Sequence, residues 1–114
     1  INLQDGASLN AESCSVENNH DVGVFVMAAT ATLVNAQVTN TNLRLDGTGG
    51  SGIVVQDGGS VTLESCVVKS NHSHGVYAGG PGTSVTLLDT LVADTLPKAD
   101  GTIPSRTTRP ATPR

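Results

Sequence analysis

The sequence predicts an all-β protein in which short parallel strands wind into a coil. Three observations predict this fold class: an internal repeat runs through most of the 114 residues, polar and apolar residues alternate within each repeat, and no segment shows the 3.6-residue periodicity of a helix. The composition agrees, because the chain has one Phe, one Tyr and no Trp. We therefore expect a narrow core of aliphatic side chains.

The internal repeat has two parts. Residues 1–28 match residues 53–80 after a shift of 52, and residues 30–48 match residues 84–102 after a shift of 54. Matched positions include Gln4/Gln56, Asp5/Asp57, Gly6/Gly58, Ser8/Ser60, Glu12/Glu64, Cys14/Cys66, Asn19/Asn71, His20/His72, Gly23/Gly75, Thr32/Thr86, Leu33/Leu87, Val38/Val92 and Thr41/Thr95. Such self-similarity indicates stacked, equivalent structural units.

Each part of the repeat predicts several short strands. A polar-apolar-polar-apolar pattern starts at Ser8, Thr30, Ser60 and Ser84, which are 22, 30 and 24 residues apart. Further strands are expected at 23–26, 52–55 and 75–78, and at 14–16, 36–38, 66–68 and 90–92. Glycine, asparagine and aspartate separate the strands, as is typical of turns. About four turns of the chain, each with three strands, describe a β-solenoid.

The order of these motifs resembles a known repeat. Gly-Val/Ile-x-Val, then Ser-x-Thr-Leu, then Cys/Ala-x-Val-x-x-Asn resembles the right-handed parallel β-helix repeat of the pectin-lyase-like superfamily, over residues 1–102. The resemblance implies a right-handed parallel β-helix of about four rungs. The superfamily includes polysaccharide lyases and hydrolases, adhesins, phage tailspikes and surface repeat proteins, so the fold alone does not assign a reaction.

Stacked rungs turn equivalent positions into columns along the coil. The expected inward columns are Ile1/Val24/Ile53/Val76, Leu3/Val26/Val55/Ala78, Leu9/Ala31/Val61/Val85, Ala11/Leu33/Leu63/Leu87 and Val16/Val38/Val68/Val92. Two polar columns, Asn18/Asn40/Ser70/Asp94 and Asn19/Thr41/Asn71/Thr95, follow the third strand. We expect their side chains to bond backbone groups that the turn leaves unpaired.

The charge and the ends of the chain bear on its partners. Residues 1–102 hold all ten acids against Arg44, Lys69 and Lys98, a net charge of 3 − 10 = −7, which argues against nucleic acid as a partner. No run approaches the roughly 20 apolar residues of a membrane span.

Residues 103–114 are rich in Pro, Thr and Arg and predict a disordered tail. Neither end shows a cap, so we expect an uncapped fragment that contacts neighbouring rungs or associates end to end.

The cysteines and histidines suggest no cofactor or metal. Cys14 and Cys66 share a column two rungs apart, about 9.6 Å at the strand spacing, which is too far for a disulfide, so we expect two buried, reduced thiols. His20 and His72 share another column, and His72 and His74 would project to one side of an extended backbone. That pair lacks the third ligand that zinc ordinarily requires, so no metal site is predicted.

The two aromatic residues mark the first candidate binding site. Phe25 and Tyr77 occupy one outward column of the first strand, with Val54 between them and Asn2 before Phe25. Two rings on one exposed apolar strip suit stacking on the sugars of an extended glycan. The same strip could instead pack beneath another chain segment or have no role.

Two longer turns mark a second candidate site. Residues 42–48 and 96–102 align, and they place Arg44 with Asp46 and Lys98 with Asp100 on one side of the coil. In lyase-like relatives a working site collects carboxylates, a metal and a basic residue on the outside of one sheet, so these four residues are where chemistry would be sought. Solvated turns closed by Asp-Gly are the structural alternative.

The preferred functional hypothesis is a non-catalytic structural or binding segment of a secreted or cell-surface, bacterial-type β-helix protein, with a polysaccharide as its candidate ligand. No residue is assigned a catalytic role, and no cofactor is expected. One alternative is a fragment of a polysaccharide lyase or hydrolase with catalytic rungs outside this chain. Another is ice binding, because Ser8/Thr30/Ser60/Ser84 and Asn10/Thr32/Thr62/Thr86 form two outward ranks of small polar residues.

Overall fold

A computed structural model describes residues 1–43 and 47–96, which form twelve β-strands and no helix. Sheet A contains β1 (Asn2–Gln4), β4 (Val22–Met27), β7 (Ser51–Gln56) and β10 (Val76–Gly79). Sheet B contains β2 (Ser8–Glu12), β5 (Thr30–Val34), β8 (Ser60–Glu64) and β11 (Ser84–Leu88). Sheet C contains β3 (Ser15–Glu17), β6 (Gln37–Thr39), β9 (Val67–Lys69) and β12 (Leu91–Ala93).

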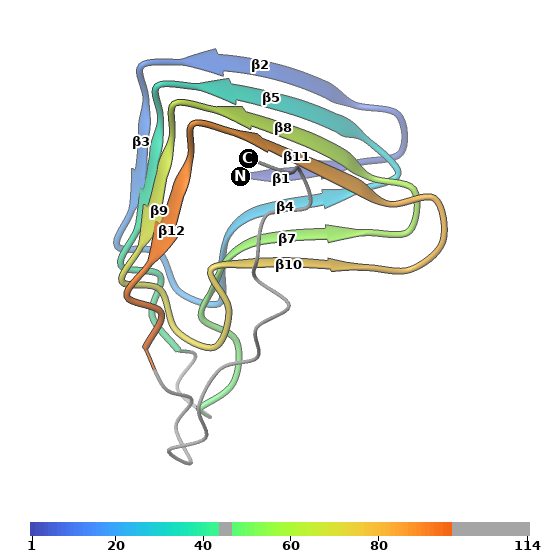
Figure 1. The fold of residues 1–114 in the computed structure, drawn as a ribbon. Coiled ribbons are helices and arrows are strands. Elements are labelled where there is room, and N and C mark those ends of the chain that lie inside the picture. The colour runs from blue at the N-terminus through green and yellow to red at the C-terminus, as the bar shows by residue number, and fades with distance from the viewer. Residues whose placement is uncertain (44–46, 97–114) are drawn as a thin grey trace.

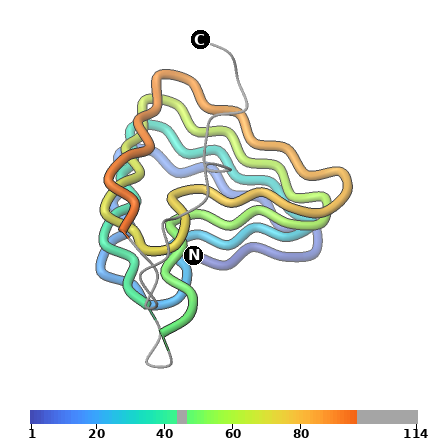
Figure 2. Tube along the Cα trace, turned by 60° about the horizontal axis from the view of Figure 1, so that its bottom comes forward, coloured from blue at the N-terminus to red at the C-terminus, as the bar shows by residue number. Residues whose placement is uncertain are grey.

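Each turn of the coil adds one strand to each sheet. Rung 1 is β1–β3, rung 2 is β4–β6, rung 3 is β7–β9 and rung 4 is β10–β12, and every pairing between rungs is parallel (Figure 1). Sheets A and B face each other and sheet C closes one side, so the stacked turns enclose one interior (Figure 2). The predicted all-β parallel solenoid with four rungs is therefore confirmed.

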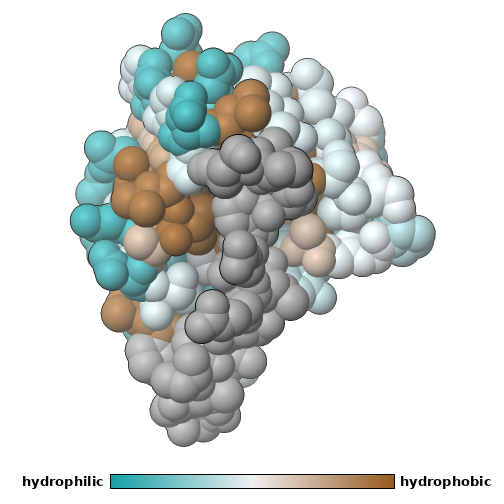
Figure 3. Space-filling view, in the orientation of Figure 1, coloured by the Kyte–Doolittle hydropathy of each residue, from teal (hydrophilic) through white to brown (hydrophobic). Residues whose placement is uncertain are grey.

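Rung 4 lies nearest the viewer in Figure 1. In the same orientation, hydrophobic residues gather on this end of the coil, over β12 (Figure 3). Leu88 and Leu91 of this rung are among the exposed large hydrophobic residues, and Leu91 is 54% exposed. Rung 4 thus leaves two large hydrophobic side chains exposed on the outer faces of sheets B and C.

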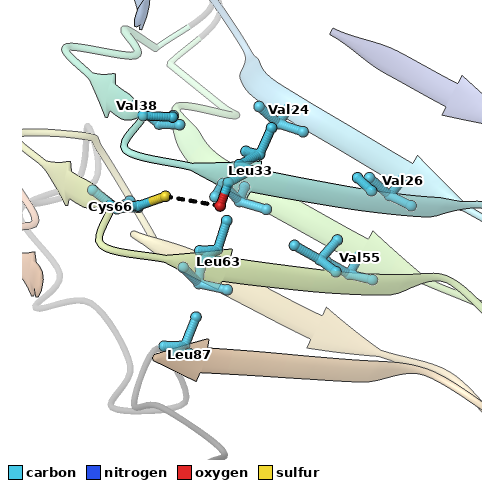
Figure 4. Packing of buried hydrophobic residues seen from close by; sticks show 14 of the residues in the cluster. Val24, Val26, Leu33, Val38, Val55, Leu63, Cys66 and Leu87 are labelled. Atoms are coloured by element: carbon cyan, nitrogen blue, oxygen red, sulfur yellow. Dashed lines mark hydrogen bonds between the residues drawn. The ribbon is translucent and has the colours of Figure 1, made fainter. Parts of the chain in front are cut away.

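The core follows the five predicted aliphatic columns in the predicted register, with two exceptions: Ile1, which is 45% exposed, and Ala78 are exposed rather than buried. Ala29, Ala36 and Cys66, which lie outside these columns, also belong to the core. One column, for example, pairs Ala11 with Leu33, Leu33 with Leu63 and Leu63 with Leu87. The side chains from the facing strands of rungs 2 and 3 meet in the interior (Figure 4). Residues of the same columns in rungs 1 and 4, such as Leu9 and Val85, are only partly buried because each has a neighbouring rung on one side alone.

Left-handed residues stack at the corners between the sheets. The corner after sheet B has Ser13, Asn35, Ser65 and Asp89 with φ of 57, 55, 54 and 47°. The corner after sheet C has Asn18, Asn40, Ser70 and Asp94 with φ of 60, 56, 59 and 51°. Asparagine, aspartate and serine tolerate this conformation because their short polar side chains bond nearby backbone.

The corners also correct the predicted third strands. These strands begin at Ser15, Gln37, Val67 and Leu91, one residue later than expected. The expected first residues, Cys14, Ala36, Cys66 and Thr90, directly follow the left-handed residue and belong to the bend. The alternation of side chains was therefore interpreted correctly, but the bend occupies one more residue than predicted.

In the second polar column, Asn71 makes the backbone hydrogen bonds predicted for a turn residue, whereas the buried Thr41 Oγ1 has no hydrogen-bond partner among the described residues. Asn71 is completely buried; its Oδ1 accepts a hydrogen bond from the Thr41 backbone N–H at 3.0 Å, and its Nδ2 donates to the Val38 carbonyl at 3.0 Å. One side chain of rung 3 thereby satisfies a donor and an acceptor of rung 2. The space for it depends on Gly52, where a Cβ would lie 2.7 Å from the Asn71 Nδ2.

The two cysteines are free and belong to the same column, with Ala36 between them. Cys66 is buried, and its thiol lies 3.2 Å from the Leu33 carbonyl and 3.3 Å from the Glu64 carbonyl (Figure 4). Cys14 is only half-buried, contrary to the expectation that both are buried, because rung 1 is covered on one side alone. The predicted two-rung separation is confirmed.

Several predicted features lie outside the described residues. These are Arg44 and Asp46 in the first long turn, Lys98 and Asp100 in the second, the last part of the expected β-helix at 97–102, and the expected tail at 103–114. Their predictions stay predictions.

Candidate functional site

The outer face of sheet A carries the predicted aromatic column. Asn2 pairs with Phe25, Phe25 with Val54, and Val54 with Tyr77, so the four residues follow one another across four adjacent strands. Two strand spacings separate the Phe25 and Tyr77 backbones, about 9.6 Å. Because inward residues such as Val24 and Val26 alternate with Phe25, the aromatic ring necessarily faces away from the core.

Exposure along this column is uneven. Tyr77 is 36% exposed, Phe25 is half-buried and Val54 is only 7% exposed. The expected strip of three exposed apolar residues is therefore wrong in its middle member. Val54 stands between two aromatic neighbours on adjacent strands, which shield its smaller side chain. A ligand on this face would contact two aromatic rings, with the smaller Val54 side chain recessed between them.

A depression of about 490 Å³ lies beside Phe25. Its apolar lining comes from Ile1, Val22, Phe25 and Val54, and its polar lining comes from Asn2, His20, Asp21 and Gln56. Strands β1, β4 and β7 supply its floor, and the turn before β4 supplies His20 and Asp21. An apolar surface edged by several hydrogen-bonding groups is the usual composition of a small-molecule site.

A second, smaller depression adjoins the first. It encloses about 250 Å³ and is lined by Gln56, Asp57, Tyr77, Gly79 and Gly80. Gln56 lines both depressions, so the hollowed surface continues across sheet A from rung 1 to rung 4. We call this surface, defined by the residues lining the two depressions, the sheet A groove.

Sequence reasoning missed most of the polar lining of the groove. Gln56 could have been found, because it lies two residues after Val54 and therefore on the same face of β7. His20 and Asp21 lie in a turn rather than a strand, and Asp21 has φ of 76°. The alternation of inward and outward side chains does not continue through a left-handed residue such as Asp21. The sequence therefore could not predict that the His20 and Asp21 side chains line the groove.

Tyr77 has a ring partner that the sequence did not predict. The His74 and Tyr77 ring centroids lie 5.3 Å apart, with their planes inclined at 56°. Such a tilted pair restricts the Tyr77 ring and leaves it ordered on the outer face. A ring that is already held in place loses less conformational entropy when a ligand stacks on it.

The reasoning about His72 and His74 assumed extended backbone, and this assumption is wrong. Ser73 between them has φ of 62°, which breaks the alternation. The His72 Nδ1 lies 3.1 Å from the Thr41 carbonyl, while His74 packs against Tyr77. Within residues 1–43 and 47–96, no group of three or more His, Cys, Asp or Glu residues is placed to hold a metal ion.

The groove has a limited charge. The outward residues of sheet A that the structure describes are uncharged, namely Asn2, Gln4, Phe25, Met27, Val54, Gln56, Tyr77 and Gly79. The charged residues in its lining are both acidic, Asp21 and Asp57. Such a surface repels polyanions and suits a neutral ligand that offers hydroxyl groups.

The outer face of sheet B carries the two predicted ranks in register. Ser8, Thr30, Ser60 and Ser84 stack in one column, and Asn10, Thr32, Thr62 and Thr86 in the next. The Ser84 hydroxyl donates to the Ser60 hydroxyl at 3.1 Å. A hollow of about 240 Å³ lined by Asn10, Glu12, Thr32 and Val34, with Ala11, interrupts the face.

Comparison with known proteins agrees with this geometry. A family model described as the right-handed beta helix region matches residues 1–91. The chain belongs to this β-helix family. Searches of curated proteins and of solved structures found no match.

Family membership establishes the right-handed β-helix and leaves the ligand open, since this fold carries many unrelated functions. Among the described residues, no helix is long and apolar enough to cross a membrane.

Proposed function

We propose that this β-helix is a non-catalytic binding rod of a secreted or cell-surface, bacterial-type protein, and that its sheet A groove binds a neutral polysaccharide. The observation that carries the proposal is the column of Phe25, Val54 and Tyr77 beside a depression with amide, imidazole and carboxylate groups. The resemblance of the repeat to surface and secreted β-helix proteins supports the location.

The spacing of the rings supports a repeating ligand. Phe25 and Tyr77 are held on the same face by rungs that are themselves fixed by the core, so their separation does not depend on loops. A sugar polymer presents apolar ring faces at regular intervals and hydroxyl groups at its edges. The rings can stack on alternate or successive sugars, while Asn2, Gln56 and His20 offer donors and acceptors to the hydroxyl groups.

The charge of the groove supports the neutral class. A polyuronate would bring carboxylates beside Asp21 and Asp57, and like charges at short range disfavour binding. A neutral glucan, xylan or mannan avoids this cost and can donate hydroxyl hydrogens to both carboxylates.

Affinity electrophoresis of the 114-residue chain through gels that contain neutral or acidic polysaccharides tests the proposal. Retention is expected in a neutral polysaccharide gel, and both Phe25→Ala and Tyr77→Ala should reduce it. Each loses a stacking surface worth about 1 kcal/mol, or several-fold in affinity. Leu91→Ala is the matched control, because Leu91 is 54% exposed on sheet C, away from the groove.

Equal retention of the wild type, both ring variants and the control would refute the proposal. Retention that is stronger in acidic polysaccharide gels would refute the neutral class. Shortening of the polysaccharide during the experiment would refute the non-catalytic assignment and would direct attention to Arg44, Asp46, Lys98 and Asp100, where chemistry would be sought.

A further inference from the structure

We propose that the sheet A groove selects a β-1,4-linked glucan or mannan that lies along the axis of the coil, with every second sugar stacked on an aromatic ring. This inference rests on the proposed function and narrows it to one type of linkage. Phe25, Val54 and Tyr77 lie in one column on three adjacent rungs. The groove follows this column, because Gln56 lines both of its depressions. A polymer in the groove therefore crosses the strands from rung to rung.

The spacing of the column sets how many sugars separate the two rings. Adjacent strands are about 4.8 Å apart, which is close to the length that one sugar adds to an extended chain. One sugar then lies over each rung: the first on Phe25, the second over Val54 and the third on Tyr77. The rings therefore contact alternate sugars, because stacking on successive sugars would require rings on adjacent rungs.

The recessed middle of the column fits this alternation. Val54 is only 7% exposed, so the second sugar contacts no aromatic surface. Gln56 lies two residues further along β7, on the same face, and lines the groove. Its amide offers two donors and one acceptor group to the hydroxyl groups of the second sugar.

The linkage decides whether alternate sugars can present the same face in line. In a β-1,4-linked glucan or mannan both linking bonds are equatorial, so the chain is extended and each sugar is turned over relative to the one before it. The first and third sugars then present the same apolar face. In an α-1,4-linked glucan the axial bond bends the chain into a coil, which moves the third sugar away from a straight column. The stacked rungs of this β-helix therefore favour the β-1,4 linkage.

The Tyr77 ring has a position that suits such stacking. Gly79 follows Tyr77 by two residues on the same face of β10, and a Cβ at Gly79 would lie 2.9 Å from the Tyr77 Oη and 3.1 Å from its Cε2. The ring thus leans along the strand over Gly79, and His74 flanks it with ring centroids 5.3 Å apart. A leaning ring presents its side to a sugar that passes over the sheet. Gly79 is therefore a positioning residue for the contact with the third sugar.

NMR titration of the 114-residue chain with short oligosaccharides that differ in length and linkage tests the inference. Cellotriose, which is β-1,4-linked, reaches both rings at once, whereas cellobiose reaches only one. Cellotriose should therefore bind about fivefold more tightly, equivalent to about 1 kcal/mol. The β-1,4-linked mannotriose and mannobiose provide the same comparison. Maltotriose and maltose, the α-1,4-linked controls, should show no such step in affinity.

Three variants locate the step in affinity. Phe25→Ala and Tyr77→Ala each leave one ring, so the trisaccharide and the disaccharide should bind nearly equally. Gly79→Ala keeps both rings, but its Cβ would displace the end of the Tyr77 ring, so most of the step should be lost. Its thermal melt should stay nearly unchanged, because Gly79 is not left-handed and the nearest atoms belong to the movable end of Tyr77. Leu91→Ala, the control on sheet C, should keep the full step.

Equal binding of trisaccharide and disaccharide in both β-1,4-linked series would overturn the inference, as would an equal step in the α-1,4-linked series. A full step in any of the three groove variants would also overturn it, because the rings would then not contact the first and third sugars as assigned. If neutral polysaccharide gels still retained the wild type more strongly than the ring variants, the proposed function would stand without this linkage. Loss of that retention difference as well would refute both.

Discussion

Replacing Asn71 should destabilise the β-helix more than any other single polar substitution in its interior turns. The side chain is fully buried, and its amide is the partner of one backbone donor and one backbone acceptor of the preceding rung. In Asn71→Ala both backbone groups lose this partner in a place that water does not reach. An unsatisfied buried group costs about 1–3 kcal/mol, so the two together cost about 2–6 kcal/mol.

This loss is a large part of the 5–15 kcal/mol that typically stabilises a domain. Since 1 kcal/mol shifts the Tm of a domain of this size by about 4–8 °C, we expect Asn71→Ala to lower the Tm by at least about 8 °C. Thermal and urea unfolding followed by circular dichroism at low protein concentration measure the effect. Asn19→Ala is the matched control in the same column, and it should change the unfolding free energy by less than about 0.5 kcal/mol.

A second substitution at the same site separates the two hydrogen bonds. In Asn71→Asp the acceptor toward Thr41 remains, but an oxygen replaces the donor and faces the Val38 carbonyl. Burial and this carbonyl raise the pKa of the introduced carboxyl in the folded state above its unfolded value of about 3.9. The neutral form is thus favoured by folding, so the variant should gain stability as the pH falls from 7 toward 4. Equal stability of the wild type and Asn71→Ala, or a pH-independent Asn71→Asp, would refute the reasoning.

The remaining predictions concern Gly52 and the cysteines. Gly52→Ala should lower the unfolding free energy by more than about 2 kcal/mol, because its Cβ would lie 2.7 Å from the Asn71 Nδ2 and from the Gly75 carbonyl. Gly58→Ala is the control: its Cβ would meet nothing within 4 Å, although its φ of +86° is strained. Urea unfolding should therefore show a smaller loss of stability for Gly58→Ala than for Gly52→Ala. In the native state an alkylating reagent should modify the half-buried Cys14 faster than the buried Cys66, and peptide mass spectrometry should find no crosslink between them; equal rates or a crosslink would contradict the register.

The sequence could predict which residues share a column of the candidate site, but it could not predict how exposed they are or which side chains outside the column they contact. The pairing of Phe25, Val54 and Tyr77 in one column could be predicted, because alternation and the 52-residue repeat set both the face and the rung. The burial of Val54 could not, because it depends on the size of the side chains on the two adjacent strands. Nor could the His74–Tyr77 contact, since the left-handed Ser73 turns the chain between strands.

The sequence by itself determined the fold class, the number of rungs and the register of the five aliphatic columns. It could do so because a two-residue alternation sets which face of a strand is buried, and a repeat sets which residues stack. Only the tertiary structure decided how the turns place their side chains: that Asn71 reaches back to Thr41 and Val38, and that His20 and Asp21 line the groove beside Phe25. Turns with left-handed residues follow no periodic rule, so the positions of their side chains come from the rungs packed on either side.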